Sequence, residues 1–355
     1  MTKQSPFAVS SSYSSSQQSE PMTYGKYRDH GYQARTLESK GAAQCLPEDV
    51  TAAQAFEMAG LSFNVAQTTP QILTPNGIST APEFAAVYRE DTGKILGIQS
   101  SKYAPVQNSD IARIFDQLDG IAVIESALCC REGRRLYVTA RIGADQEITP
   151  GDQLRRYLHV FNSHDGGTSV GAFFTDRRLA CANQIAGNIR AASSRGNAQA
   201  LTFKHTSGVT DFVRSLPAFI DCQRHQFRSD VDSYRQLTKL QLTPEIVKQT
   251  LSETYSAELS RPIKDKQTKE NRARKVEELR AFQNIRNLYR GEAHGANLPG
   301  FAGTAWGLLN AITEHETHGG NLSNTDKARQ RLEALYHGTA GGRIEKARHS
   351  LLAMV

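Results

Sequence analysis

The pattern of hydrophobic and polar positions changes about half-way along the chain. Between Leu61 and Phe203, short segments rich in β-branched and aromatic residues alternate with tight turns, a pattern typical of β-strands. Strands are expected at residues 61–67, 83–90, 94–100, 120–130, 135–142, 157–162 and 169–175, and helices at 47–60, 108–118 and 180–192. This order predicts an α+β fold built on an antiparallel sheet of hairpins.

From Thr206 onward, apolar residues recur at helical spacing. Helices are expected at residues 210–240, 244–256, 267–289, 303–315, 325–336 and 344–354. The N-terminal residues 1–40 are instead rich in Ser, Gln, Tyr and Arg and poor in aliphatic side chains, which favours disorder. We therefore expect a disordered arm (1–40), a sheet-rich α+β core (41–205) and a helical C-terminal half (206–355) packed on that core.

Composition places the chain among globular proteins. Of its 355 residues, 39% are hydrophobic and 22% are charged, and no apolar run is long enough to span a bilayer. The first residues lack the apolar segment of a signal peptide, and the five cysteines form no CxxC pair. These features predict a cytoplasmic protein without a membrane partner.

Positive charge is concentrated in two blocks. The net charge is +6, and residues 131–204 hold eleven Lys or Arg against six acidic residues. Residues 261–290 hold ten against four. Such a distribution favours a polyanionic partner.

The first block coincides with a hairpin that carries aromatic residues. Tyr157 to Phe161 and Val170 to Thr175 read as its strands, and Arg177 and Arg178 follow. Aromatic rings beside guanidinium groups could stack bases and hold phosphates. On residue types alone, the commoner arrangement is a half-buried hairpin whose rings face the core and whose arginines pair with Asp165 or Asp176.

The second block, from Lys266 to Arg286, is expected on a helix. Its positive residues partly align at helical spacing, whereas the usual alternative is a solvated face held by pairs such as Glu270 with Arg274. The deficit of acidic residues favours contact with a polyanion. The candidate nucleic-acid-binding residues of the two blocks are Arg155, Arg156, Tyr157, Phe173, Phe174, Arg177, Arg178, Asn183, Lys204, Lys266, Lys269, Arg272, Arg274 and Lys275.

Two motifs carry a family resemblance that covers roughly residues 80–318. The run NSHDGGTS…FFTDRRLACAN and the later TAWGLLNAITEHETH resemble an uncharacterised phage- and plasmid-related domain family. Gln184 departs from the Thr that is usual there. The hairpin-rich pattern is also similar, more distantly, to the RecT/Redβ/Erf group of single-strand annealing proteins. That likeness implies self-association into rings or filaments.

Other chemistries find little support in the motifs. The two histidines of His315–His318 are three apart, whereas the zincin motif requires four, so helix capping and packing explain them better. The segment His164-Asp165-Gly166-Gly167 fits a tight turn. No phosphate-binding GxxxxGK[ST] loop or dinucleotide-binding GxGxxG loop is present, and no cofactor is expected.

The sequence thus predicts a non-enzymatic protein of a phage, plasmid or integrated element that binds single-stranded DNA and promotes annealing. Two alternatives stay open. One is a metal-dependent nuclease or other hydrolase that uses His164, Asp165 and Asp176. The other is a host-interaction protein, such as an antirestriction factor, that acts through its acidic and Gly-rich C-terminal loops.

Overall fold

The computed structural model describes residues 44–46, 50–118, 120–180, 183–186, 200–206, 209–265, 268, 270–319 and 325–355. The expected arm at residues 1–40 lies outside these ranges, as do two of the candidate binding residues, Lys266 and Lys269.

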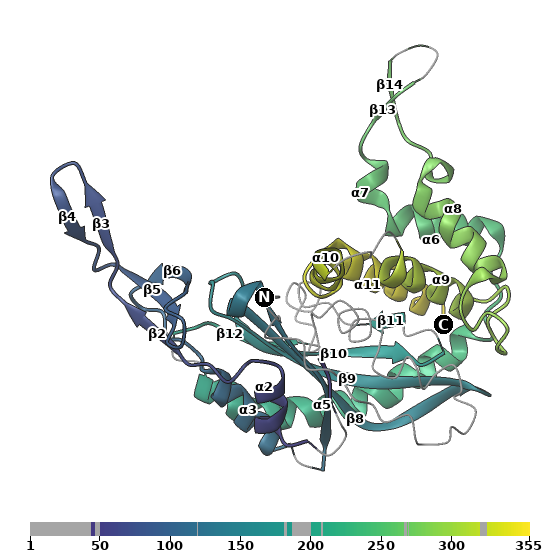
Figure 1. Cartoon of the computed structure of the whole chain (residues 1–355). Helices are drawn as coiled ribbons and strands as arrows, with labels where there is room; N and C mark the ends of the chain where they lie inside the picture. The colour runs from purple at the N-terminus through teal and green to yellow at the C-terminus, as the bar shows by residue number, and fades with distance from the viewer. Residues whose placement is uncertain are drawn as a thin grey trace, which may run out of the picture.

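An antiparallel sheet of seven strands forms the centre of the described part of the chain (Figure 1). Its order is β1-β7-β8-β9-β10-β11, and β12 pairs with β10. The strands are β1 (Gln44–Cys45), β7 (Ala122–Cys130), β8 (Arg135–Thr149), β9 (Asp152–Ser163), β10 (Val170–Arg178), β11 (Asn183–Ala186) and β12 (Ala200–Phe203).

Both faces of this sheet are apolar. Tyr137 is aligned with Phe161 and the next residue, Val138, with Val160, so successive side chains point to opposite faces. Tyr137 and Phe161 belong to one hydrophobic cluster and Val138 and Val160 to another. The central strands therefore have to be covered on both sides.

Helices cover the two faces (Figure 1). Helices α2 and α3 and the first half of α5 complete the cluster of Val138 and Val160, whereas α10 and α11 pack on the opposite face. A third cluster joins the far end of the sheet to the end of α5 and to α6, α8, α9 and α11. The helices are α2 (Ala52–Met58), α3 (Asn108–Asp116), α5 (Val209–Leu237), α6 (Pro244–Thr254), α7 (Ser256–Leu259), α8 (Arg280–Asn287), α9 (Ala305–His318), α10 (Thr325–Tyr336) and α11 (Thr339–Leu352), with short 3-10 segments η2 (Arg131–Gly133) and η3 (Val276–Glu278) and the π-helical segment η4 (Leu288–Glu292).

Two hairpins project from this body (Figure 1). One consists of β3 (Gln71–Thr74) and β4 (Gly77–Thr80) and extends from a small sheet of order β2-β5-β6, made by β2 (Val65–Thr68), β5 (Phe84–Arg89) and β6 (Ile95–Ser100). The other consists of β13 (Ile263–Lys264) and β14 (Asn271–Arg272) and lies between α7 and α8. We call them the uncharged hairpin and the basic hairpin, because the first carries no charged residue and the second lies in the basic block of residues 261–290.

The expected α+β class and the helical C-terminal half are confirmed. Two expected helices, at 180–192 and 267–289, differ from the structure over part of their length. Residues 183–186 form the strand β11, which packs under α9 and α11 and buries all four side chains. In the segment 267–289 the first apolar residue larger than alanine is Val276, so little apolar surface can pack a helix before it. The described part contains β14 and η3, and the helix is limited to α8, which begins at Arg280.

Candidate nucleic-acid interface

The aromatic and arginine platform expected on the hairpin β9–β10 lies in the interior. All nine residues of β10 are buried, and so are the candidates on β9 and β11. The buried candidates are Arg155, Arg156, Tyr157, Phe173, Phe174, Arg177, Arg178 and Asn183. The hairpin β9–β10 was expected to line an open groove for nucleic acid, and this expectation is wrong. The alternative arrangement, a hairpin whose rings face the core, is the one observed.

Helices cover the aromatic rings of β10 on both faces of the sheet. The ring of Phe173 lies 4.9 Å from that of Tyr336 on α10, centroid to centroid. The ring of the next residue, Phe174, lies 5.4 Å from that of Phe219 on α5, on the opposite face. Neither ring is available for stacking on a base.

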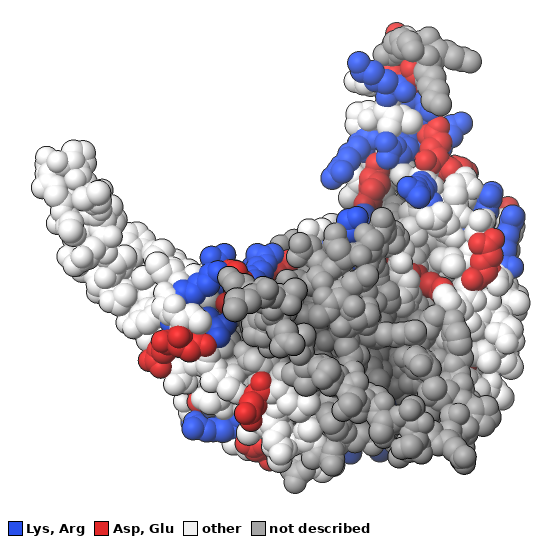
Figure 2. Space-filling model, viewed as in Figure 1, with Lys and Arg blue, Asp and Glu red and all other residues white. Residues whose placement is uncertain are grey.

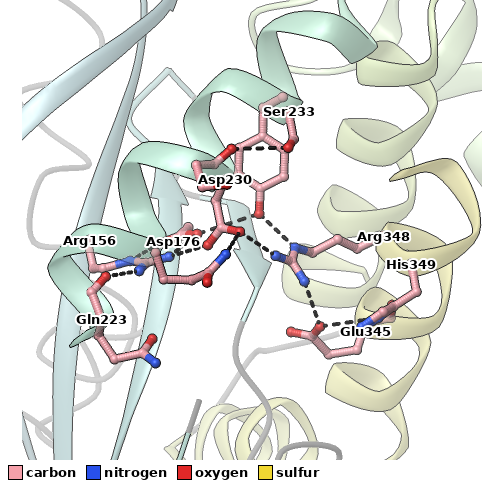
Figure 3. A network of polar contacts seen from close by, with 11 residues as sticks. Arg156, Asp176, Gln223, Asp230, Ser233, Glu345, Arg348 and His349 are labelled. Carbon is pink, nitrogen blue, oxygen red and sulfur yellow. Dashed lines mark hydrogen bonds and ion pairs between the residues drawn. The ribbon is translucent and has the colours of Figure 1, made fainter. Parts of the chain in front are cut away.

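Arg156 is the centre of a buried polar network (Figure 3). Its guanidinium donates two hydrogen bonds to the carboxylate of Asp176, at 2.7 and 2.9 Å, and one to Asp230 Oδ2, at 2.8 Å. It also donates to the backbone oxygen of Gln223, at 2.6 Å. Burial alone would lower the pKa of Arg156, but the two carboxylates outweigh it and raise the pKa. Arg156 therefore stays charged and joins β9 and β10 to α5.

The network continues to the C-terminal helix through Asp230 (Figure 3). Arg348 on α11 donates to Asp230 Oδ1 at 3.1 Å and to the hydroxyl of Tyr234 at 2.7 Å. Glu345, one turn earlier on α11, pairs with Arg348 at 3.5 Å. The network thus fixes α5 and α11 to the sheet.

A second buried joint connects the two motif segments. Arg178, at the end of β10, and Trp306, in the TAWG segment of α9, both donate to the carboxylate of Asp152, at 2.6 and 2.9 Å. Asn183 donates to the backbone oxygen of Asn310 at 3.2 Å. The motifs at residues 175–183 and 304–314 therefore meet in the interior and hold the sheet against α9.

The remaining arginines of the hairpin also have partners inside the protein. Arg155 binds the carboxylate of Asp145 with two hydrogen bonds of 2.7 Å. The guanidinium of Arg177 lies 4.5 Å above the ring centre of Tyr157. These contacts assign the first basic block mainly to the stability of the fold.

The His-Asp-Gly-Gly segment forms a turn, as the sequence suggested. Asp165 Oδ1 accepts a hydrogen bond from the backbone NH of Gly167 at 2.8 Å, and Gly166 has a φ of +70°. The imidazole of His164 is buried and bonds to Asn108 Oδ1 at 3.1 Å.

Asp176 does not join His164 and Asp165 in a common site. Asp176 is aligned with Arg156 on β9. His164 comes eight positions after Arg156, just beyond the end of β9, and this separation corresponds to roughly 27 Å along the strand direction. Asp176 is also held by Arg156. The three residues suggested for a hydrolase, His164, Asp165 and Asp176, therefore do not form a common site.

The residues that the structure describes contain no group of three or more His, Cys, Asp or Glu side chains arranged to hold a metal ion. His315 lies in α9, and burial lowers its pKa to about 4. Likewise, none of the helices in the described ranges is both long and apolar enough to cross a membrane.

The remaining described candidates lie on the surface. Lys204 follows β12 and is exposed, far from the basic hairpin (Figure 1). Arg272 on β14 pairs with Asp265 and Glu278, at 3.1 and 2.6 Å, and the hydrogen bond that it donates to Glu278 is the main reason that the pKa of Arg272 is raised. Arg274 is half-buried and Lys275 is exposed, just after β14.

Two further cations of the basic hairpin were not among the candidate residues. Arg261 and Lys264 are both exposed, at the start of the hairpin and on β13. Figure 2 shows that Lys and Arg gather on this projection, whereas the uncharged hairpin across the gap carries none. The charge count of residues 261–290 was the signal that could have identified them.

The comparison with known families gives one match. A family model described as "Domain of unknown function (DUF932)" matches residues 95–336. The chain belongs to the DUF932 family. The comparisons with curated proteins and with solved structures found no match.

The DUF932 match runs from β6 to α10 and includes the His-Asp-Gly-Gly turn, β10 and α9. The resemblance to an uncharacterised domain family is thereby confirmed, while the link to phages and plasmids and the distant likeness to annealing proteins stay predictions. The uncharged hairpin, at residues 71–80, lies outside the DUF932 match.

Proposed function

We propose that this DUF932 protein binds single-stranded DNA through the basic hairpin and promotes the annealing of complementary strands. The proposal rests on the basic hairpin and the residues beside it, where several positive side chains have no carboxylate partner among the described residues. Arg261, Lys264 and Arg274 form no salt bridge with any described residue, although Arg272 on the same projection has two carboxylate partners. Lys275 adds a fourth cation; it is exposed, as are Arg261 and Lys264, whereas Arg274 is half-buried.

The chemistry of the hairpin favours contact with phosphates. Residues 261–281 contain no aromatic side chain, so they offer cations for the backbone and no ring for a base. Phosphate contacts carry no sequence information and leave the pairing edges of the bases free. Binding of this kind suits a protein that brings two complementary strands together, as the likeness to annealing proteins implies.

The test uses fluorescence anisotropy with single-stranded and double-stranded oligonucleotides. The double variant Lys264→Ala/Arg274→Ala should reduce single-strand affinity by roughly tenfold or more, because two charge-assisted contacts are removed. The matched control is Arg224→Ala/Arg228→Ala, which removes the same charge from exposed positions of α5. The control should bind nearly as the unaltered protein does.

A strand-pairing assay completes the test. Dye-labelled complementary strands should pair faster with the protein than without it, and the double variant should lose most of this effect. Equal affinity of the double variant and the control would contradict the assignment of the hairpin. Chelator-sensitive degradation of the DNA would support the hydrolase alternative, and an absence of DNA binding together with capture of a host protein would support the host-interaction alternative.

A further inference from the structure

Positive side chains gather at the end of the central sheet where β9 turns into β10. Arg135, at the start of β8, is aligned with Ser163, at the end of β9. Val170, at the start of β10, is aligned with Phe203, at the end of β12. We call this the motif end of the sheet, because the His-Asp-Gly-Gly turn of residues 164–167 belongs to it. Its cations are Lys94, Lys102, Arg131, Arg134, Arg135 and Lys204.

The turn between β7 and β8 brings two of these cations to the motif end. The backbone oxygen of Arg134 accepts a hydrogen bond from the backbone NH of His164 at 2.7 Å, so Arg134 lies against the His-Asp-Gly-Gly turn. Lys94, between β5 and β6, pairs with Glu132, two positions before Arg134. The small sheet and the central sheet therefore both contribute positive charge here.

Lys102 and Lys204 lie at the same end because their neighbours in the chain contact each other. Tyr103, directly after Lys102, donates a hydrogen bond from its hydroxyl to the backbone oxygen of Ser163 at 3.1 Å. The ring of Tyr103 is stacked on that of His205, which directly follows Lys204, with ring centres 4.9 Å apart. Both lysines are exposed. They therefore present their charge to solvent beside the end of β9.

The carboxylates at the motif end pair with only some of its cations. The salt bridges are Lys94–Glu132, Arg131–Glu333, Arg135–Glu333 and Arg135–Asp165. Lys102, Arg134 and Lys204 form no salt bridge with any residue in the described ranges. The Nε atom of Arg134 is also buried without a hydrogen-bond partner among these residues. Three cations are thus left for a partner from outside.

The motif end and the basic hairpin lie at opposite ends of the sheet. The hydrophobic cluster of α6 and α8, the helices on either side of the basic hairpin in the chain, includes Leu154 at the start of β9. The motif end lies at the other end of this strand, whose 12 residues span about 40 Å. Figure 2 shows Lys and Arg on the body at the base of the uncharged hairpin, across the gap from the basic hairpin.

We propose that the motif end is a second site for the phosphates of a single-stranded nucleic acid, with Lys102, Arg134 and Lys204 as its contacts. Cations of this kind bind the phosphate backbone whatever the base sequence. The rings of Tyr103 and His205 are buried and stacked on each other, so they are not available to bases. The inference extends the proposed function, and rests on it for the contact of the same strand with the basic hairpin.

Oligothymidylates of two lengths test the second site by fluorescence anisotropy. A strand of about 6 nucleotides spans roughly 20 Å at the spacing of stacked bases, whereas about 20 nucleotides span roughly 70 Å and can reach both ends of the sheet. In the full-length chain, Lys102→Ala/Lys204→Ala should lower the affinity for the long strand by about tenfold, because two charge-assisted contacts are removed. Affinity for the short strand should stay within about twofold, because the basic hairpin still holds it.

The salt dependence gives a second readout of the same contacts. With the long strand, Lys102→Ala/Lys204→Ala should reduce the slope of log affinity against log salt concentration by about 1.4 in magnitude. Both side chains are exposed, so the variant should keep the melting temperature of the unaltered chain in circular dichroism. An unchanged slope and an unchanged affinity for the long strand would overturn the second site.

Two further variants separate this site from the basic hairpin. Arg224→Ala/Arg228→Ala removes the same charge from exposed positions of α5 and should bind both strands as the unaltered chain does. A loss as large in this control as in the motif-end variant would overturn the proposal. Lys264→Ala/Arg274→Ala tests the hairpin alone. Normal binding by this variant, with loss in Lys102→Ala/Lys204→Ala, would refute the hairpin and support the motif end.

Discussion

Arginines that look alike in the sequence have opposite environments in this fold. Arg156 and Arg178 are buried. Two carboxylates and one backbone oxygen hold Arg156, and one carboxylate and two backbone oxygens hold Arg178. Lys264 and Arg274, in contrast, have no salt bridge with a described residue. A buried guanidinium supports the fold through its partners, whereas an exposed one is available to a ligand.

Removal of Arg156 should severely destabilise the protein. In Arg156→Ala, the buried carboxylate of Asp176 loses both of its hydrogen bonds from the guanidinium, and Asp230 loses one. The expected fall in the free energy of unfolding is about 3–5 kcal/mol, measured by urea denaturation. Arg224→Ala, at an exposed position on α5, should change it by less than about 0.5 kcal/mol. Equal effects of the two variants would contradict the structural role of Arg156.

Stability should also depend on His164. Burial, helped by His205, lowers its pKa from 6.5 to about 4. Between these values the unfolded chain binds the proton and the folded chain does not, so the free energy of unfolding decreases as the pH falls from 6.5 towards 4. The contribution of one such group is at most about 1.4 kcal/mol per pH unit.

Urea denaturation as a function of pH can isolate this contribution. His164→Gln should flatten the dependence between pH 6 and pH 4 by up to about 1.4 kcal/mol per pH unit. Between pH 7 and pH 8 the curves of the variant and the parent should run parallel, because His164 is neutral in both the folded and the unfolded chain there. A variant with the same acid slope as the parent would show that His164 does not titrate on unfolding.

At the scale of elements, the two projections are independent of the core. No residue of the uncharged hairpin belongs to a hydrophobic cluster of the described structure. Replacement of residues 71–80 by a short Gly-Ser loop should therefore change the melting temperature by no more than a few degrees, measured by circular dichroism. A large loss of thermal stability would show that the hairpin supports the fold.

Local patterns predicted the elements but not their burial. The segments with a clear period, such as α6 and α10, were located almost to the residue, because a first-turn proline or a regular apolar spacing defines them. The strand β11 was taken for a helix because its packing under α9, more than a hundred residues later in the chain, is a long-range contact that the local pattern does not show. Burial of β10 on both faces was not predicted, because the alternative considered was a hairpin that is buried on one face only.

The candidate site was predictable only in part for the same reason. Sequence identifies Arg177 as a cation but does not show that helices close over both faces of its sheet. The excess of positive charge in residues 261–290 depends on composition alone, and it indicated a block of cations that lies on the surface even though only its last part, α8, is the expected helix. The uncharged hairpin was missed because exposed isoleucine and leucine are unremarkable until their neighbours in space are known.

At the scale of the whole molecule, the sheet is covered by helices, so a partner has to bind to features of the surface. The sheet is covered on both faces, and the features that project are the two hairpins on either side of a gap (Figure 2). One is basic and the other is uncharged, so they suit different partners.

Salt dependence should reveal how many cations contact the DNA. Each phosphate neutralised on a single strand contributes about 0.7 to the slope of log affinity against log salt concentration. Contact by Arg261, Lys264, Arg274 and Lys275 of one copy therefore predicts a slope near −3, measured by anisotropy from low to physiological salt. Lys264→Ala/Arg274→Ala should reduce the magnitude of this slope by about 1.4, while Arg224→Ala/Arg228→Ala should leave it unchanged. Binding that does not respond to salt would contradict a phosphate-directed hairpin, and a slope that the double variant leaves intact would place the contacts on other cations of the molecule.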